Sequence, residues 1–179
     1  IISTVTKYVK NKYPALNPQF KFQDTKKYGP AAGLLPWLNG DEDNILVLFG
    51  DNFYQGKVDF SLVKERGVDA VASYKMYERD EDNLRLAAVD METETLLEKP
   101  HHITSGAFFC GYVFFSPKGF SQLRKLQPST GRGEYEITEL FNSVQNRKLQ
   151  PVVENWTDLT YKIDDKSVNN FIAKAKSTQ

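Results

Sequence analysis

The chain has 179 residues, of which 40% are hydrophobic and 26% charged, a composition typical of one soluble globular domain with a substantial core. Lysine plus arginine and aspartate plus glutamate number 23 each, and this balance predicts no general attraction to nucleic acid or to an anionic membrane. The single cysteine, Cys110, excludes an internal disulfide and a zinc site built from several cysteines, and agrees with a reducing cytoplasm.

Targeting and membrane segments are not predicted. No run of about 18 apolar residues occurs, so we expect no transmembrane helix. Ile1 opens directly into an amphipathic segment rather than a signal peptide, and the absence of an initial Met leads us to expect a fragment, a processed product or a partial sequence. The histidines His101 and His102 are neighbours that would point apart on a strand, so we expect loop residues and not a shared metal site.

The first forty residues predict two helices and a short strand. Apolar side chains recur at helical spacing in residues 1–13, which predicts a helix that ends before Pro14. Residues 20–22 alternate between aromatic and polar side chains and predict a strand that leads to Gln23. Residues 31–38 then predict a second helix.

Residues 45–49 form a short, continuous apolar run that is bounded by turn residues. Such a run favours a central strand of a sheet that is covered on both faces, whereas a buried helix would be longer. The run ends at Gly50, Asp51 and Asn52, where we expect glycine to permit a backbone geometry that other residues resist.

Strands and helices alternate along the rest of the chain, which predicts an α/β sandwich with a mostly parallel sheet in a single domain of residues 1–179. Ligands of such sheets bind beyond the carboxyl ends of the strands, so Asp51 is the first place to look for chemistry. The predicted elements are helices at 60–66, 117–126, 136–146 and 167–175, strands at 68–74, 108–115 and 149–153, and a hairpin of 86–90 with 95–100.

Four segments carry residue types suited to a phosphorylated ligand, and each also has a purely structural explanation. Asp51 could hold Mg²⁺ or sit in a simple turn. Lys99 and Glu98 could bind a phosphate and hydroxyls or form a solvated charge pair. Glu136 and the polar residues before it could simply cap a helix, and Asp164 could be an acidic residue favoured by the dipole of the last helix.

The order of these segments is more informative than any one of them. From about residue 20 to residue 175 the chain closely resembles the sugar-1-phosphate nucleotidylyltransferases, most nearly their glucose-1-phosphate thymidylyltransferase branch. The segments R-G-E-x-E-I-T and E-K-P are fairly specific, and G-D-N after a strand is moderately so. The resemblance rests on Gly50-Asp51-Asn52, Glu98-Lys99-Pro100, residues 105–115, residues 132–138 and Asp164.

The resemblance implies a Rossmann-like three-layer sandwich with a mixed, mostly parallel central sheet, N-terminally incomplete. It implies transfer of a nucleoside monophosphate from dTTP or UTP to glucose-1-phosphate or a related sugar phosphate, in a cytoplasmic enzyme that uses Mg²⁺ and releases pyrophosphate. A nucleoside triphosphate and a sugar-1-phosphate would be the partners, with no nucleic acid or membrane. The base, the sugar and the oligomeric state, a homo-oligomer included, stay open.

The family pattern also assigns roles to residues. Asp51, Lys99 and Asp164 would be catalytic, with Asp51 and Asp164 holding Mg²⁺ and Lys99 binding the phosphate of the sugar. Asp158 is a rival of Asp164 for the metal. The substrate-binding residues would be Gln23 and Gly29 at the base, Glu98, Glu134 and the backbone of Phe109 at the sugar hydroxyls, and Arg132 near the sugar phosphate.

Two departures from the family support an alternative. The glycine-rich loop that holds the triphosphate is absent from the sequence, so we expect little turnover from this chain alone. Arg85 stands where the family has a glycine that lets the backbone approach the sugar. The alternative is a catalytically inactive nucleotide-sugar-binding or regulatory module of the same fold. Retention of both metal carboxylates, Asp51 and Asp164, favours the enzyme.

Overall fold

The computed structural model describes residues 2–40, 43–55, 59, 61–78, 86–100, 105–152 and 155–158. Its helices are α1 (Ile2–Lys12), η1 (Pro14–Leu16), η2 (Ala31–Trp37), η3 (Leu62–Lys64), α2 (Pro117–Phe120), η5 (Ser121–Lys125) and α3 (Ile137–Asn142). Its strands are β1 (Ile45–Leu48), β2 (Asn52–Gln55), β3 (Ala70–Glu78), β4 (Ala88–Asp90), β5 (Thr95–Leu97), β6 (Ser105–Phe115), β7 (Arg147–Pro151) and β8 (Asn155–Asp158).

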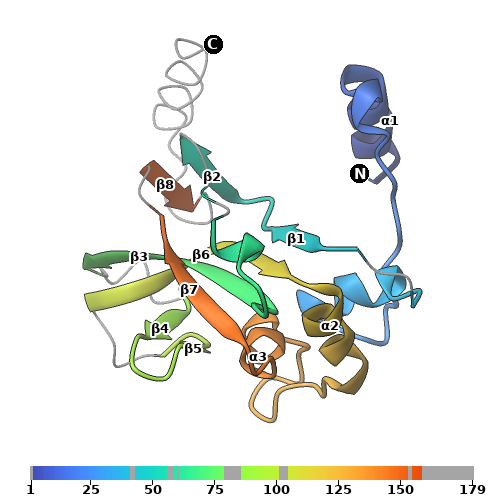
Figure 1. Ribbon diagram of the computed structural model, residues 1–179. Helices are drawn as coiled ribbons and strands as arrows, with labels where there is room; N and C mark the ends of the chain where they lie inside the picture. The colour runs from blue at the N-terminus through green and yellow to red at the C-terminus, as the bar shows by residue number, and fades with distance from the viewer. Residues whose placement is uncertain are drawn as a thin grey trace.

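Strand β6 is the centre of the six-stranded main sheet (Figure 1). Strand β3 pairs with it from Ser105 to Phe115 and so occupies one whole edge. Strands β1 and β4 share the other edge, β1 opposite the second half of β6 and β4 opposite the first. Strand β5 follows β4, and β7 follows β3, so the sheet order is β5-β4-β6-β3-β7.

The shared edge of β6 opens where β1 and β4 part. The amide of Phe49 donates to the carbonyl of Gly111 at 3.0 Å, and the amide of Phe109 donates to the carbonyl of Ala87 at 2.9 Å. Gly111 has φ 80, and a Cβ placed there would meet the Asn52 side chain at 2.5 Å. This break in the edge, with Gly111 in the left-handed region, makes room between the two strands.

The two faces of the sheet carry separate apolar clusters. The larger one packs η2, η5 and α3 against β6 and β3, and its fully buried rings are Phe115, Phe120 and Phe141. The smaller one lies on the other face, where Phe108 packs with Leu86, Ala88 and the half-buried Trp156 of β8. Alternation along β6 explains the division, since Phe108 and its neighbours Ala107 and Phe109 point to opposite faces.

Side-chain hydrogen bonds fix the β4–β5 hairpin to α3. The Asn142 amide donates to the carbonyl of Leu96 and accepts from its N–H, both at 2.8 Å. The Arg147 guanidinium donates to the carbonyl of Glu94 at 2.7 Å and to that of Val144 at 2.9 Å. The β4–β5 hairpin is therefore held beside the end of α3, which matters for the site described below.

The observed α/β architecture with an open mixed sheet is the predicted one, but its strand directions differ from the prediction. Among the described strands only β3 and β7 pair in parallel, while β6 runs antiparallel to β1, β3 and β4. The alternation of helices and strands could not reveal this, because direction depends on where β6 inserts and not on the order of elements in the chain.

The first part of the chain corrects three further expectations. Residues 20–22 form no strand; no described strand pairs with them, and Phe22 is 71% exposed. Strand β1 is not covered on both faces, since Leu46 and Leu48 are exposed and β6 is its one partner among the described strands. Gly50 has an ordinary negative φ and open space around its Cβ position.

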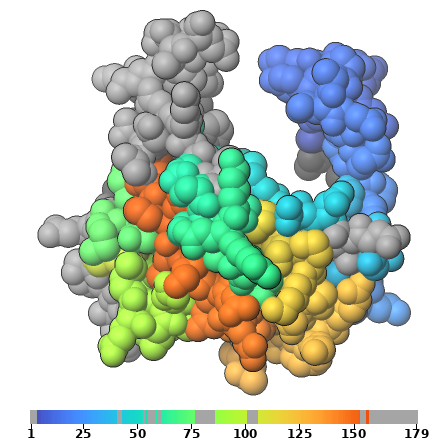
Figure 2. Space-filling model, in the orientation of Figure 1, coloured from blue at the N-terminus to red at the C-terminus, as the bar shows by residue number. Residues whose placement is uncertain are grey.

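Other elements agree with the sequence prediction. Helix α1 is confirmed, although it stands apart from the sheet and leaves Val5 and Tyr8 exposed (Figures 1 and 2). The hairpin, the core strand β6 and strands β3 and β7 are confirmed, whereas the helix expected at 60–66 is reduced to the single turn η3. The helix expected at 167–175 lies outside the described residues. No helix in the described ranges combines the length and apolar character of a transmembrane span.

Gly29 is tied to Tyr135 and generates the first prediction. It has φ 114, a Cβ there would meet the Tyr135 backbone at 2.6 Å, and the amide of Tyr135 donates to the carbonyl of Tyr28 at 2.7 Å. Gly29→Ala should therefore lower the free energy of unfolding by about 3 kcal/mol, measured by urea denaturation. Gly131→Ala is the control, since nothing lies within 4 Å of its Cβ position. Equal stability of the two variants would contradict the close approach.

Candidate active site

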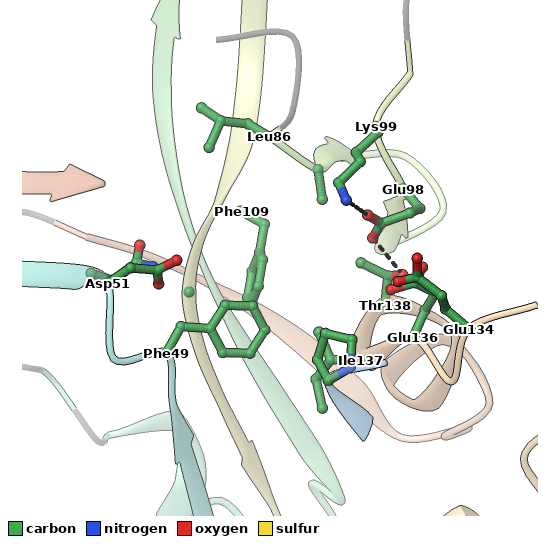
Figure 3. Close-up of a pocket in the computed structure, with 14 residues that line it drawn as sticks. Phe49, Asp51, Leu86, Glu98, Lys99, Phe109, Glu134, Glu136, Ile137 and Thr138 are labelled. Carbon is green, nitrogen blue, oxygen red and sulfur yellow. Dashed lines mark hydrogen bonds and ion pairs between the residues drawn. The ribbon is translucent and has the colours of Figure 1, made fainter. Parts of the chain in front are cut away.

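A cavity of about 290 Å³ lies where β1 and β4 part on the edge of β6 (Figure 3). Its lining combines an apolar part with acidic and basic side chains, as binding sites for small polar ligands do. The lining residues are Pro30, Phe49, Asp51, Asn52, Leu86, Ala87, Glu98, Lys99, Phe109, Gly111, Glu134, Glu136, Ile137 and Thr138.

Two phenylalanines form the middle of the cavity and divide its polar groups into two sets (Figure 3). The rings of Phe49 and Phe109 meet edge to face, with centroids 5.8 Å apart. Asp51 lies on one side of them, and Glu98, Lys99 and Glu134 lie on the other. The ring edges and faces offer an apolar surface between two groups of charges.

Asp51 stands at the corner between β1 and β2 and is oriented through its neighbour. The Asn52 amide donates to Asp51 Oδ1 at 2.7 Å, and the Trp156 indole N–H donates to Asn52 Oδ1 at 2.7 Å. Because Gly111 leaves no side chain in the way, Asn52 fits against β6. The corner thus presents a carboxylate in a defined direction, and carboxylate oxygens are ligands that Mg²⁺ prefers.

The second predicted metal carboxylate is not placed by the structure. Asp164 lies outside the described residues. The backbone of its rival Asp158 pairs with that of Asn52 in the β2–β8 ladder, next to the Asp51 corner. Within the described ranges no group of three or more His, Cys, Asp or Glu side chains is arranged to hold a metal ion.

Arg132 gathers three carboxylates on the far side of the cavity. Its Nη2 lies 2.7 Å from Glu134 Oε1, and its Nη1 lies 3.3 Å from Glu98 Oε1 and 3.2 Å from Glu136 Oε1. One guanidinium presents several N–H donors in a rigid fork, which suits this role better than the single point charge of a lysine. The segment before α3 is thereby joined to the end of β5.

Glu98 and Lys99 follow β5 and are held in place by α3. The Thr138 hydroxyl donates to Glu98 Oε2 at 3.1 Å, and Lys99 Nζ lies 3.4 Å from Glu98 Oε1. Lys99 has φ 42, in the left-handed region that a side chain disfavours. Such backbone strain persists where the surroundings enforce it, often at functional sites. The Lys99 side chain is about one third exposed and lines the cavity.

Glu136 carries the most perturbed carboxyl group of the site. Burial raises its pKa from 4.5 to about 7, and the neighbouring Glu98 and Glu134 carboxylates add to this effect, which Arg132 and Lys99 oppose. The side chain is only 3% exposed. Near neutral pH this buried group therefore exchanges a proton, which few carboxyl groups do.

A second, shallower hollow adjoins the cavity and contains the remaining predicted residues. Gln23, Gly29 and Arg132 line it, and it shares Pro30, Lys99 and Glu134 with the cavity. Gln23 Nε2 donates to the carbonyl of Lys27 at 2.6 Å, which holds the loop before Gly29. The structure thus brings the predicted base-side and sugar-side residues to neighbouring hollows, and leaves Asp164 undescribed.

Sequence reasoning missed part of this site. Helix capping was one explanation that the sequence allowed for Glu136, yet its side chain accepts no cap hydrogen bond from α3. Thr138 and Asn52 also line the cavity, although neither was predicted as a site residue. Both lie inside the motifs on which the resemblance rests, and this position was the one signal that could have found them. Phe49 ends the apolar run of β1 and gave no sign of facing a cavity, because a core phenylalanine has the same pattern.

Comparison with known proteins connects this site to one family. A bifunctional protein GlmU of Methanococcus maripaludis is 30% identical over 160 residues, which are 86% of this chain and 38% of that protein. A UTP–glucose-1-phosphate uridylyltransferase, AglF, of Haloferax volcanii is 33% identical over 104 residues, 55% of this chain and 42% of that protein. The homologues of this chain are sugar-1-phosphate nucleotidyltransferases. A search of protein-family models gives no match.

Solved structures share the fold of this chain. A Bacillus anthracis chain described as a glucose-1-phosphate thymidylyltransferase superimposes with a TM-score of 0.71 at 19% identity, over 94% of this chain and 71% of that one. A UDP-glucose pyrophosphorylase in complex with UDP-glucose gives 0.64 at 14% identity, over 98% and 72%. The chain spans about two fifths of the curated relatives named above, at 38% and 42%.

The raised pKa of Glu136 generates a prediction about stability. A carboxyl group whose pKa is higher in the folded than in the unfolded chain binds more protons when folded, so stability should fall as pH rises from 4.5 to about 7. The loss amounts to at most about 3 kcal/mol, reduced by the water that screens the partly exposed Glu98 and Glu134 carboxylates, which help to raise this pKa.

Urea denaturation of the wild type and of Glu136→Gln between pH 4.5 and 8 would measure this loss. The amide does not titrate, so the stability of the wild type relative to the variant should decline across this range. A difference that stays constant with pH would show that Glu136 ionises as in the unfolded chain.

Proposed function

We propose that the protein carrying this chain transfers a nucleoside monophosphate from dTTP or UTP to glucose-1-phosphate or a related sugar phosphate, and releases pyrophosphate. The observation that carries the proposal is one cavity that joins Asp51 to Lys99, Glu98 and Glu134 across two aromatic rings. In this proposal Asp51 can bind a metal ion and Lys99 a phosphate, while Glu98 and Glu134 can accept hydrogen bonds from sugar hydroxyls. The names of the relatives, which include a uridylyltransferase, agree with this reaction.

The reaction requires neutralisation of phosphate charge and precise positioning more than covalent chemistry. An oxygen of the sugar phosphate attacks the α-phosphorus of the triphosphate in line and forms a new P–O bond. The bond from the α-phosphorus to its bridging oxygen breaks, and pyrophosphate leaves with the electron pair. Mg²⁺ would neutralise the triphosphate when it is bound at Asp51 and a second carboxylate, for which Asp158 and Asp164 are the candidates.

The proposal assigns a role in binding to the charged and aromatic side chains on the Lys99 side of the cavity. Lys99, whose side chain lines the cavity, binds the phosphate of the sugar. Glu98 and Glu134 accept hydrogen bonds from ring hydroxyls, while Phe49 and Phe109 cover the apolar face of the ring. Gln23 and Gly29 in the adjoining hollow meet the base, which places the two substrates side by side.

Binding and turnover distinguish the enzyme from a binding module. α-D-Glucose 1-phosphate is titrated into the chain by calorimetry, and pyrophosphate release is followed with Mg²⁺, the sugar phosphate and each of dTTP, UTP, ATP, GTP and CTP, in the chain and in the whole protein. Turnover with one triphosphate supports the transferase. Binding without turnover in the whole protein supports the inactive module, and absence of binding contradicts both.

Lys99 provides a direct test of the phosphate position. Lys99→Ala removes the ammonium group that faces the cavity, so the affinity for α-D-glucose 1-phosphate should fall roughly 10- to 100-fold, the worth of one charge-assisted hydrogen bond. Lys125→Ala is the matched control, because Lys125 is exposed on η5 and lines neither hollow. An unchanged affinity in Lys99→Ala would place the phosphate elsewhere.

Asp51 tests the metal side independently. Asp51→Asn keeps the size of the side chain but removes its charge, so Mg²⁺-dependent triphosphate binding should weaken by at least about tenfold. Sugar-phosphate binding without Mg²⁺ should be retained, since Glu98 and Lys99 are untouched. Loss of both together with a lowered melting temperature would indicate a structural role for Asp51 instead.

A further inference from the structure

Glu136 occupies the N-cap position of α3 but does not act as a cap. Its backbone has φ −87 and ψ 140, the extended geometry of a capping residue, yet its side chain accepts no hydrogen bond from the first turn. An N-cap carboxylate normally satisfies one of the free amides of that turn. Here the side chain lines the cavity instead, beside Glu134 and Thr138 (Figure 3).

The carboxyl group of Glu136 is buried and incompletely bonded. It is 3% exposed, and its Oε1 accepts no hydrogen bond from the described residues. Arg132 Nη1 lies 3.2 Å from this oxygen as an ion-pair partner, but outside hydrogen-bonding geometry. A buried acceptor that is left without a donor destabilises the site, so a donor supplied by a ligand would be favoured.

The charges around Glu136 do not balance. Arg132 is shared by three carboxylates, and Lys99 forms an ion pair with one of them, Glu98, at 3.4 Å. Three acidic groups thus face two basic ones, and burial raises the pKa of Glu136 to about 7. In the ligand-free cavity at neutral pH, Glu136 accordingly spends part of its time protonated.

We propose that Glu136 is a specificity-determining residue, whose ionised carboxylate accepts a hydrogen bond from a ring hydroxyl of the bound sugar phosphate and whose proton is released on binding. This inference rests on the proposed function, and it adds a residue and a proton linkage to the sugar side of the site. The proton passes from the carboxyl group to the solvent, and no covalent bond changes.

The ionised form is the one that the ligand selects. Arg132 stands beside Oε1 and stabilises negative charge there, and a hydroxyl bonds more strongly to a carboxylate than to a carboxylic acid. A ligand that stabilises the ionised form lowers the pKa in the complex, so binding tightens as pH rises through the value of the free site. The titratable and charged groups near Glu136 are Glu98 and Lys99 after β5, Arg132 and Glu134 before α3, Glu139 within α3, and Asp51 across the cavity.

The same contact confers selectivity among sugars. Removal of the sugar hydroxyl that donates a hydrogen bond to Glu136 would leave a buried carboxylate without a donor. Sites built in this way strongly reject the sugar analogue that lacks this hydroxyl. A carboxylate also repels a second phosphate or a carboxylate at that position of the ring. The acidic side of the cavity therefore selects a neutral, hydroxyl-bearing ring, with the phosphate at Lys99.

Calorimetry of α-D-glucose 1-phosphate binding tests the proton linkage. The wild type, Glu136→Gln and Glu139→Gln are titrated at pH 6, 7 and 8, in buffers that differ in ionisation enthalpy, so that released protons are counted. Glu139 is the control because it lies on the same helix with a raised pKa but does not line the cavity. The phosphate of the ligand titrates equally with all three proteins, so the comparison isolates Glu136.

The wild type and Glu139→Gln should release about half a proton more than Glu136→Gln at pH 7, and their affinity should rise about tenfold more between pH 6 and 8. Deoxy analogues of α-D-glucose 1-phosphate, each lacking one hydroxyl, are then compared with the parent ligand. One of them should bind the wild type at least about tenfold more weakly than the parent ligand does, and this ratio should be smaller for Glu136→Gln.

Equal proton release and equal pH dependence in the wild type and Glu136→Gln would overturn the inference while leaving the proposed function intact. If the wild type does not bind α-D-glucose 1-phosphate, both the inference and the proposed function are contradicted. If Glu136→Gln shows no cooperative melting, the titration of the Glu136 carboxyl carbon by NMR replaces it. Its midpoint should move to lower pH when the wild type binds α-D-glucose 1-phosphate, and an unmoved midpoint contradicts the proposal.

Discussion

The pairing along β6 is the constraint on which the rest of the molecule depends. One edge of this strand is filled by β3 alone, and the other is divided between β1 and β4. The two strands part at Gly111, whose left-handed backbone lets Asn52 approach β6. The cavity lies at this division, with Asp51 after β1 on one side of it and Glu98 after the β4–β5 hairpin on the other.

The two sides of the cavity are built by different means. The Asp51 side relies on a relay of neutral hydrogen bonds, from Trp156 to Asn52 and from Asn52 to Asp51. The other side relies on one guanidinium that joins Glu98, Glu134 and Glu136. The relay orients a single carboxylate, whereas the shared guanidinium keeps three carboxylates close together and partly balances their charge.

Elements outside the cavity hold its acidic side in place. Asn142 and Arg147 bind the β4–β5 hairpin to α3, and Gly29 lies against Tyr135 at the loop that precedes this helix. The end of β5, the start of α3 and the loop at Gly29 therefore form one connected unit. Because they are connected, the cavity and the adjoining shallower hollow keep a common wall of Lys99 and Glu134.

The sequence by itself determined the α/β class, the main strands and most of the residues that gather at the cavity, because motif order and apolar runs are local properties of the chain. It could not determine strand direction or the one-sided exposure of β1, since both depend on neighbours distant in sequence. Nor could it show that Glu136 turns away from its helix. The position of Glu136 in the cavity depends on its burial and on the Arg132 guanidinium that it shares with Glu98. Only the tertiary structure brings Glu98, Arg132 and Glu136 together.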